Sequence, residues 1–108
     1  MAEATRKLAA IVFTDIVGFT KLSSKDENKA FSLLDTQRIT LKPIVNEFGG
    51  EWLKEMGDGI LMTFPTVSAA VECAISIQKA VKKINDLNLR IGIHEGEIKI
   101  IVMSTFLN

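Results

Sequence analysis

The feature that most constrains the fold of this chain is a hairpin signal at residues 51–65. Two largely apolar stretches, EWLKEM and ILMTFP, flank the tripeptide GDG. Glycine adopts positive φ at low cost, so this tripeptide suits a tight turn between two antiparallel strands. Any architecture for the chain must therefore accommodate an antiparallel pair of strands near its middle.

The segments on either side of the hairpin predict helices and two further strands. Residues 8–16 form a short apolar run that suits a strand covered on both faces, although periodicity alone does not exclude a helix. Residues 18–25 predict a short helix. Residues 26–50 carry apolar side chains three and four apart, the helical period, and end in Gly-Gly. Residues 66–86 repeat the helical spacing, and residues 87–94 alternate like a strand.

This order predicts an α+β fold in which the helices cover one face of an antiparallel sheet. The expected arrangement is ferredoxin-like, βααββαβ, with the first helix in two pieces. A chain of 108 residues accommodates one domain, so we expect residues 1–108 to form a single unit.

Composition excludes several classes of function. The chain has 13 basic and 13 acidic residues, and a net charge of zero argues against a nucleic-acid partner, which requires a basic face. No apolar run approaches the ~18 residues of a membrane span, and the start does not resemble a signal peptide. Cys73 is the only cysteine, which rules out an internal disulfide and a cysteine metal site. We therefore expect a cytoplasmic protein.

Two carboxylates fall where neighbouring strands end. Asp15 closes the first predicted strand, and Asp58 lies in the hairpin turn. In a ferredoxin-like sheet these strands are neighbours, and converging carboxylates repel unless a cation lies between them. Mg²⁺ suits hard oxygen ligands and phosphates, and the backbone amides of Gly18, Phe19 and Thr20 at a helix start suit a phosphate. The pattern indicates a metal–triphosphate site. The alternative is that Asp15 caps a helix and Asp58 only shapes a turn.

Three motifs resemble the class III nucleotidyl cyclase domain, the family of adenylate and guanylate cyclases. They are FTDIVGFT, FGGEWLKEMGDGILMTFP and LRIGIHEGEI, and the resemblance runs from about residue 8 to about residue 97. It implies two Mg²⁺ or Mn²⁺ ions, held by the Asp15 and Asp58 carboxylates with the Ile16 backbone carbonyl. It also implies terminal phosphates on the amides of Phe19 and Thr20. Lys54 matches the lysine that reads adenine, which implies ATP as the substrate.

The resemblance implies conversion of ATP to 3′,5′-cyclic AMP and pyrophosphate by a two-metal mechanism. The family site forms between two domains, so we expect a homodimer or a partner cyclase domain. The family also supplies an asparagine and an arginine in an N-x-x-x-R pattern, which is absent after His94. The chain therefore resembles the N-terminal part of a cyclase domain and is expected to be inactive or weak alone, without catalytic residues beyond the metal ligands.

Two other interpretations remain. The chain is alternatively a non-catalytic nucleotide-binding, metal-binding or dimerisation module. A palm-type polymerase or diguanylate cyclase domain is disfavoured, because its hairpin turn resembles G-G-D/E-E-F and the turn here is MGDGI.

The last residues predict an interaction. Residues 98–107 are mostly apolar, and an exposed apolar strand recruits another chain. We expect this tail to continue the strand at residues 89–97 and to pair with a neighbouring chain.

Overall fold

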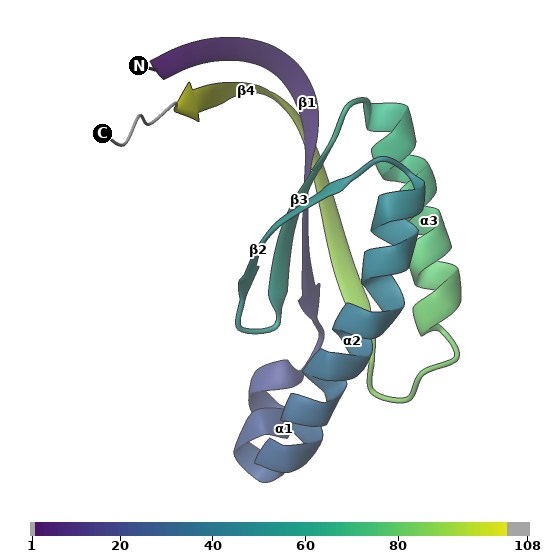
Figure 1. Ribbon diagram of the computed structural model, residues 1–108. Coiled ribbons are helices and arrows are strands. Elements are labelled where there is room, and N and C mark those ends of the chain that lie inside the picture. The colour runs from purple at the N-terminus through teal and green to yellow at the C-terminus, as the bar shows by residue number, and fades with distance from the viewer. Residues whose placement is uncertain (1, 104–108) are drawn as a thin grey trace.

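The computed structural model describes residues 2–103, with side chains from residue 6 to residue 99. Helices and strands follow one another in the predicted order (Figure 1). Their bounds are β1 Ala2–Ile16, α1 Phe19–Lys25, α2 Glu27–Glu47, β2 Glu51–Met56, β3 Gly59–Phe64, α3 Val67–Val81 and β4 Leu89–Met103.

The strands form one four-stranded sheet in the order β2-β3-β1-β4, and each neighbouring pair is antiparallel. The helices α2 and α3 lie together on one side of this sheet, and α1 lies below the end of β1 (Figure 1). The predicted ferredoxin-like α+β arrangement is confirmed. Because β1 lies between β3 and β4, its C-terminal end meets both the hairpin turn and the start of β4.

The core lies between the sheet and the two long helices. Alternate residues of β1 and β3 face this core, and α2 and α3 each contribute a stripe of buried side chains at helical spacing. The largest fully buried side chains are Phe64, Leu41, Ile60, Met62, Ile77, Leu87, Val12, Val45 and Cys73. Burial raises the pKa of the Cys73 thiol to about 11, so this cysteine acts as a small apolar side chain rather than as a nucleophile.

Side-chain caps define the starts of the long helices. The Asp26 carboxylate accepts a hydrogen bond from the Lys29 amide at 3.0 Å, and the Thr66 hydroxyl accepts one from the Ala69 amide at 3.0 Å. Both contacts satisfy a backbone donor that has no partner within its helix. In each long helix, the N-cap side chain therefore replaces the backbone carbonyl acceptor that the first turn lacks.

The first strand is longer than the sequence predicts. It begins at Ala2 rather than Leu8, and residues 2–8 pair with residues 97–103 of β4 as a two-stranded ribbon that curves away from the helices (Figure 1). The ribbon helps to give the chain a radius of gyration of 16.2 Å, against ~13 Å for a compact domain of this length. The strand at the start of the chain was not predicted, because its partner in β4 lies about 90 to 100 positions away in the sequence.

The predicted continuation of the strand beyond Glu97 is confirmed as far as Met103, where β4 pairs on one side with β1 of the same chain. Pairing with a neighbouring chain stays a prediction. The predicted tail residues 104–107 lie outside the described residues. Among the described strands, β4 pairs with β1 on one side and forms the edge of the sheet on the other.

Candidate functional site

The hairpin turn is hydrogen-bonded to the end of β1. Gly57 adopts φ 61°, and Met56 pairs with Gly59 across the turn, so Asp58 lies at its tip. One carboxylate oxygen of Asp58, Oδ2, accepts a hydrogen bond from the backbone amide of Ile16 at 2.8 Å. A Cβ on Gly59 would lie 3.3 Å from the Thr14 carbonyl oxygen, so this close approach favours glycine. The contact fixes the Asp58 carboxylate beside the end of β1.

Asp15 lies opposite Arg90 in the register of β1 and β4. The Arg90 Nε donates a hydrogen bond to Asp15 Oδ1 at 2.8 Å. The pKa of the Arg90 guanidinium is raised, chiefly by this hydrogen bond and by the Asp15 charge, with a smaller contribution from Asp58. Both side chains are substantially exposed, so the pair is open to solvent and to ligands.

A left-handed glycine turns the chain from β1 into α1. Gly18 has φ 76°, a conformation that side chains other than glycine rarely adopt, and it occupies the N-cap of α1. The Val17 amide donates to the Asn88 carbonyl at 2.8 Å, which ties this turn to the loop before β4. The amides of Phe19 and Thr20 follow in the first turn of the helix, where amides have no partner within the helix.

These elements enclose a shallow hollow of about 400 Å³. Six of the seven predicted site residues line this hollow: Asp15, Ile16, Gly18, Phe19, Thr20 and Asp58. Lys21 and Arg90 also line it. The structure therefore brings both carboxylates and the glycine turn to one place. Lys54 does not line this hollow.

Sequence reasoning missed three residues at this site, namely Lys21, Arg90 and Gln37. Arg90 lies on the polar side of an alternating strand, and only the sheet reveals its register opposite Asp15. Gln37 is 3% exposed and lies on the buried stripe of α2, where an amide is unexpected. Its Nε2 donates to the Asp58 carbonyl at 3.4 Å, which supports the turn from beneath. A polar residue within an apolar helical stripe was the signal for Gln37.

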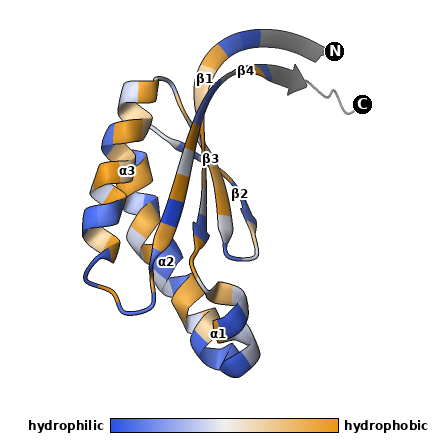
Figure 2. Cartoon of the chain, turned by 180° about the vertical axis from the view of Figure 1, so that it is seen from behind, coloured by the Kyte–Doolittle hydropathy of each residue, from blue (hydrophilic) through white to orange (hydrophobic). Residues whose placement is uncertain are grey.

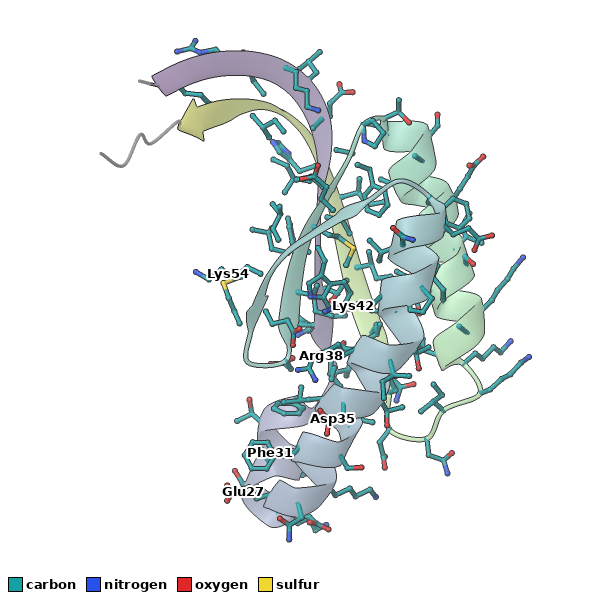
Figure 3. The ribbon with its side chains drawn as sticks, viewed as in Figure 1. Glu27, Phe31, Asp35, Arg38, Lys42 and Lys54 are labelled. Atoms are coloured by element: carbon teal, nitrogen blue, oxygen red, sulfur yellow. The ribbon has the colours of Figure 1, made fainter. Side chains whose placement is uncertain are left out.

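Lys54 and its neighbour Glu55 have opposite environments. The Glu55 carboxylate accepts hydrogen bonds from the Arg38 side chain, the shortest from Nη2 at 2.7 Å, and one from the Trp52 indole at 3.2 Å. These contacts with Arg38 lower the pKa of Glu55. Lys54 is exposed and projects from β2 away from α2 (Figure 3). Glu55 is thus held against a helix, while Lys54 is presented to solvent.

The donor set suits a hard cation that shares its ligands with phosphate. The interactions described above use one oxygen of each carboxylate, and each carboxylate has a second oxygen with which to bind a cation. Among the described residues no group of three or more His, Cys, Asp or Glu is placed to hold a metal. Mg²⁺ commonly binds one or two carboxylates together with substrate phosphates and water, so Asp15 and Asp58 fit that mode. Within residues 2–103, no helix is long and apolar enough to cross a membrane.

Comparison with known proteins identifies the family of the chain. The family model described as the adenylate and guanylate cyclase catalytic domain matches residues 1–106. A Rhizobium meliloti (strain 1021) protein named "Putative adenylate cyclase 3" is 37% identical over 103 residues, which are 88% of this chain and 18% of that protein.

Solved structures agree with the sequence comparison. The adenylyl cyclase CyaB from P. aeruginosa has 26% identity and a TM-score of 0.81, covering 90% of this chain and 60% of that one. An adenylate/guanylate cyclase/hydrolase from Silicibacter pomeroyi has 31% identity and a TM-score of 0.77, covering 94% and 66%. The chain thus spans less than two thirds of either solved cyclase.

Proposed function

Because this chain belongs to the adenylate and guanylate cyclase catalytic domain family, we propose that it binds ATP with Mg²⁺ or Mn²⁺ and supplies the metal-binding half of a cyclase site. The observation that carries the proposal is the convergence of Asp15, Asp58 and the Gly18 turn on one hollow. The proposed reaction joins the ribose 3′-oxygen to the α-phosphorus, breaks the bond to pyrophosphate and releases the 3′-hydroxyl proton.

The residues of the hollow have separate roles in this proposal. Asp15, Asp58 and the Ile16 carbonyl hold two cations, which when bound lower the charge on the phosphates and favour ionisation of the 3′-hydroxyl. The amides of Phe19 and Thr20 bind the terminal phosphates. Positioning of the triphosphate by this fixed set of groups supplies much of the catalysis in phosphoryl transfer.

Arg90 contributes positive charge to the same hollow. Before a nucleotide binds, its guanidinium compensates the Asp15 carboxylate at 2.8 Å. With a cation held by Asp15, the Arg90 guanidinium would be available, together with Lys21, to the anionic triphosphate. The hollow is therefore suited to a metal–nucleotide complex in which cation and anion arrive together.

Lys54 is proposed to read the adenine base of a nucleotide bound to a second domain. Its exposure on β2 and its position outside the hollow support a role across an interface, while Glu55 is occupied by Arg38. This division implies a homodimer or a pairing with another cyclase domain.

The proposed base-reading role predicts an effect of Lys54→Glu. We expect the ratio of ATP to GTP affinity to fall about tenfold or more, since loss of one hydrogen-bonded contact commonly costs that much discrimination. Competition binding of the two nucleotides with Mn²⁺ measures the ratio. Lys42→Glu, an exposed lysine on α2, is the matched control and should leave the ratio unchanged. An unaltered ratio in Lys54→Glu excludes the role.

The proposed function is tested by complementation. Alone with Mn²⁺–ATP, the chain is expected to form cyclic AMP near background, because the family's N-x-x-x-R segment is absent after His94; an arginine of this kind commonly contributes ~10³–10⁵ in rate. Mixed with an adenylate cyclase domain whose own metal-binding aspartates are replaced, it should restore cyclic AMP formation.

The same mixture containing Asp15→Asn in place of the natural chain should stay at background. If the natural chain binds Mn²⁺–ATP but restores no activity, the alternative of a non-catalytic nucleotide-binding module is favoured. If it neither binds the nucleotide nor restores activity, the proposed function is wrong.

A further inference from the structure

The strand β2 carries an irregularity beside Lys54. Trp52 lies opposite Met62 of β3. Two residues later, Lys54 lies opposite Leu61, only one residue along β3, so Leu53 is an extra residue in β2. Such a β-bulge disrupts the ladder of hydrogen bonds locally and changes the direction of nearby side chains. The pairing with β3 alone therefore fixes β2 less firmly where Lys54 lies.

The bulge places Trp52 and Glu55 on the helix-covered face of the sheet and Lys54 on the other face. Trp52 lies opposite Met62, which is 0% exposed, and Glu55 lies opposite Ile60, which is 2% exposed. Residues directly opposite each other in an antiparallel pair lie on the same face. Lys54 pairs with the residue between these two on β3, which points the other way. In a regular strand, Trp52 and Lys54 would share a face.

Polar residues of α2 hold this side of β2. The helix carries hydrophilic residues beside its hydrophobic ones (Figure 2), and Arg38 lies on the side that faces the hairpin (Figure 3). Its Nη2 donates to Glu55 Oε1 at 2.7 Å, and its Nε donates to Glu55 Oε2 at 2.9 Å. The Trp52 indole nitrogen also donates to Oε2, at 3.2 Å. The residues on either side of the bulged segment thus meet at one carboxylate, which Arg38 holds against α2.

The geometry of this group suits orientation more than stability. A single exposed ion pair contributes little to the free energy of unfolding unless it is bidentate or part of a network. The Arg38–Glu55 contact is bidentate, and Arg38 Nη1 also donates to Asp35 Oδ1 at 2.9 Å. Two such hydrogen bonds fix the relative direction of both side chains. Lys42 lies over the Trp52 ring, 5.5 Å from its centroid, which is a weak contact when exposed. Arg38 is therefore the residue of α2 that sets the direction of this part of β2.

We propose that Arg38 is a positioning residue for Lys54, an inference that rests on the base-reading role proposed above. By holding Glu55, and through it Trp52, Arg38 fixes β2 on both sides of Lys54. The Lys54 side chain then projects from the opposite face of the sheet in one direction. The direction matters because adenine carries a hydrogen-bond acceptor at N1 where guanine carries a donor, and an ammonium group only donates. A lysine that is free to reach other acceptors of the purine loses this discrimination.

The structural part of the proposal is tested without a nucleotide. Trp52 is the only tryptophan of the chain, so its fluorescence reports on this group alone. Arg38→Met removes the donors and keeps a long side chain that favours a helix. The Trp52 emission of this variant should shift to longer wavelength and be quenched more strongly by acrylamide. Lys29→Met, which removes the 2.9 Å ion pair between α2 and Asp86, is the matched control and should leave the emission unchanged. Circular dichroism should show that both variants are folded.

A double-mutant cycle tests whether Arg38 acts through Lys54. In competition binding with Mn²⁺, Arg38→Met should lower the ratio of ATP to GTP affinity about three- to tenfold, less than removal of the lysine itself. In a chain that already carries Lys54→Met, the same substitution should change the ratio by less than about twofold, because an effect exerted through Lys54 has nothing left to act on. Lys29→Met should leave the ratio unchanged in the natural chain.

The outcomes separate this inference from the proposed function. Unchanged Trp52 emission in Arg38→Met, or equal effects of that substitution with and without Lys54, overturns the positioning role. A natural chain that prefers ATP, together with an Arg38→Met variant that keeps the full preference, overturns the positioning role and leaves the proposed function standing. A natural chain that binds ATP no better than GTP, or binds neither, contradicts base reading itself and the positioning role with it.

Discussion

Replacement of Asp58 by asparagine is expected to reduce binding of Mn²⁺–ATP by more than ~100-fold, since even residues that only support a metal ligand cost 10–100-fold when changed. Asparagine keeps an oxygen that accepts the hydrogen bond from the Ile16 amide, now made by the carboxylate at 2.8 Å. It removes only the negative charge. The variant therefore separates the metal-binding role of Asp58 from its role in shaping the turn. Isothermal titration calorimetry with Mn²⁺–ATP measures the loss.

A second aspartate provides the control for this experiment. Asp26 caps α2 and does not line the hollow, and asparagine is an equally good cap. Asp26→Asn should bind the nucleotide as the natural chain does. Thermal unfolding should show that Asp58→Asn is folded. If Asp58→Asn binds Mn²⁺–ATP with unchanged affinity, the cations are held elsewhere and Asp58 serves the turn alone.

Truncation of Phe64 to alanine is expected to cost about 3–5 kcal/mol of unfolding free energy, the usual range for a buried phenylalanine. Phe64 is 2% exposed at the end of β3. A Cβ built on Gly50 would lie 2.5 Å from the Phe64 ring, which shows how closely the ring packs beside β2. Domains of this size have ~5–15 kcal/mol of stability, so the variant loses a large share. Urea unfolding followed by circular dichroism gives the difference.

Phe31 is the control for the packing argument. It lies on α2 (Figure 3) and is 56% exposed. Phe31→Ala should change the free energy of unfolding by ~0.5 kcal/mol or less, as is usual for surface positions. Equal losses for Phe31→Ala and Phe64→Ala would mean that the buried core between sheet and helices does not dominate stability.

Much of the fold was predictable because local patterns and global architecture agree. The Gly57-Asp58-Gly59 turn fixed the hairpin, and the helical spacing from Ala70 to Val81 identified α3. The ends of elements were harder to predict. The extension of β1 to Ala2 depends on pairing with residues about 100 positions away, and no local pattern encodes such a partner. Pairing of the tail with β1 was missed for the same reason, and its pairing with another chain stays a prediction.

The residues of the candidate site were likewise predictable where a local pattern marks them and were missed where only the sheet register does. Asp15, Gly18 and Asp58 were found because each lies at a break in a pattern, where a strand ends or a turn begins. Arg90 was missed because its meaning depends on the register of β4 against β1, which places it opposite Asp15. Lys54 was identified only through the family resemblance, and its role across an interface stays a prediction.

The position of β1 inside the sheet has a consequence for the chain during synthesis. Synthesis proceeds from β1 towards β4, and β1 is paired on one side by β3 and on the other by β4, which is made after the other described strands. Chains fold as they emerge, N-terminal parts first. The strands β1, β2 and β3 can therefore assemble with α2 while the side of β1 that later pairs with β4 is still unpaired. Closing that side requires contacts of very long sequence separation, which are slow to form. A nascent chain therefore passes through a period in which β1 exposes an open edge, and chaperones or a neighbouring nascent chain can engage it then.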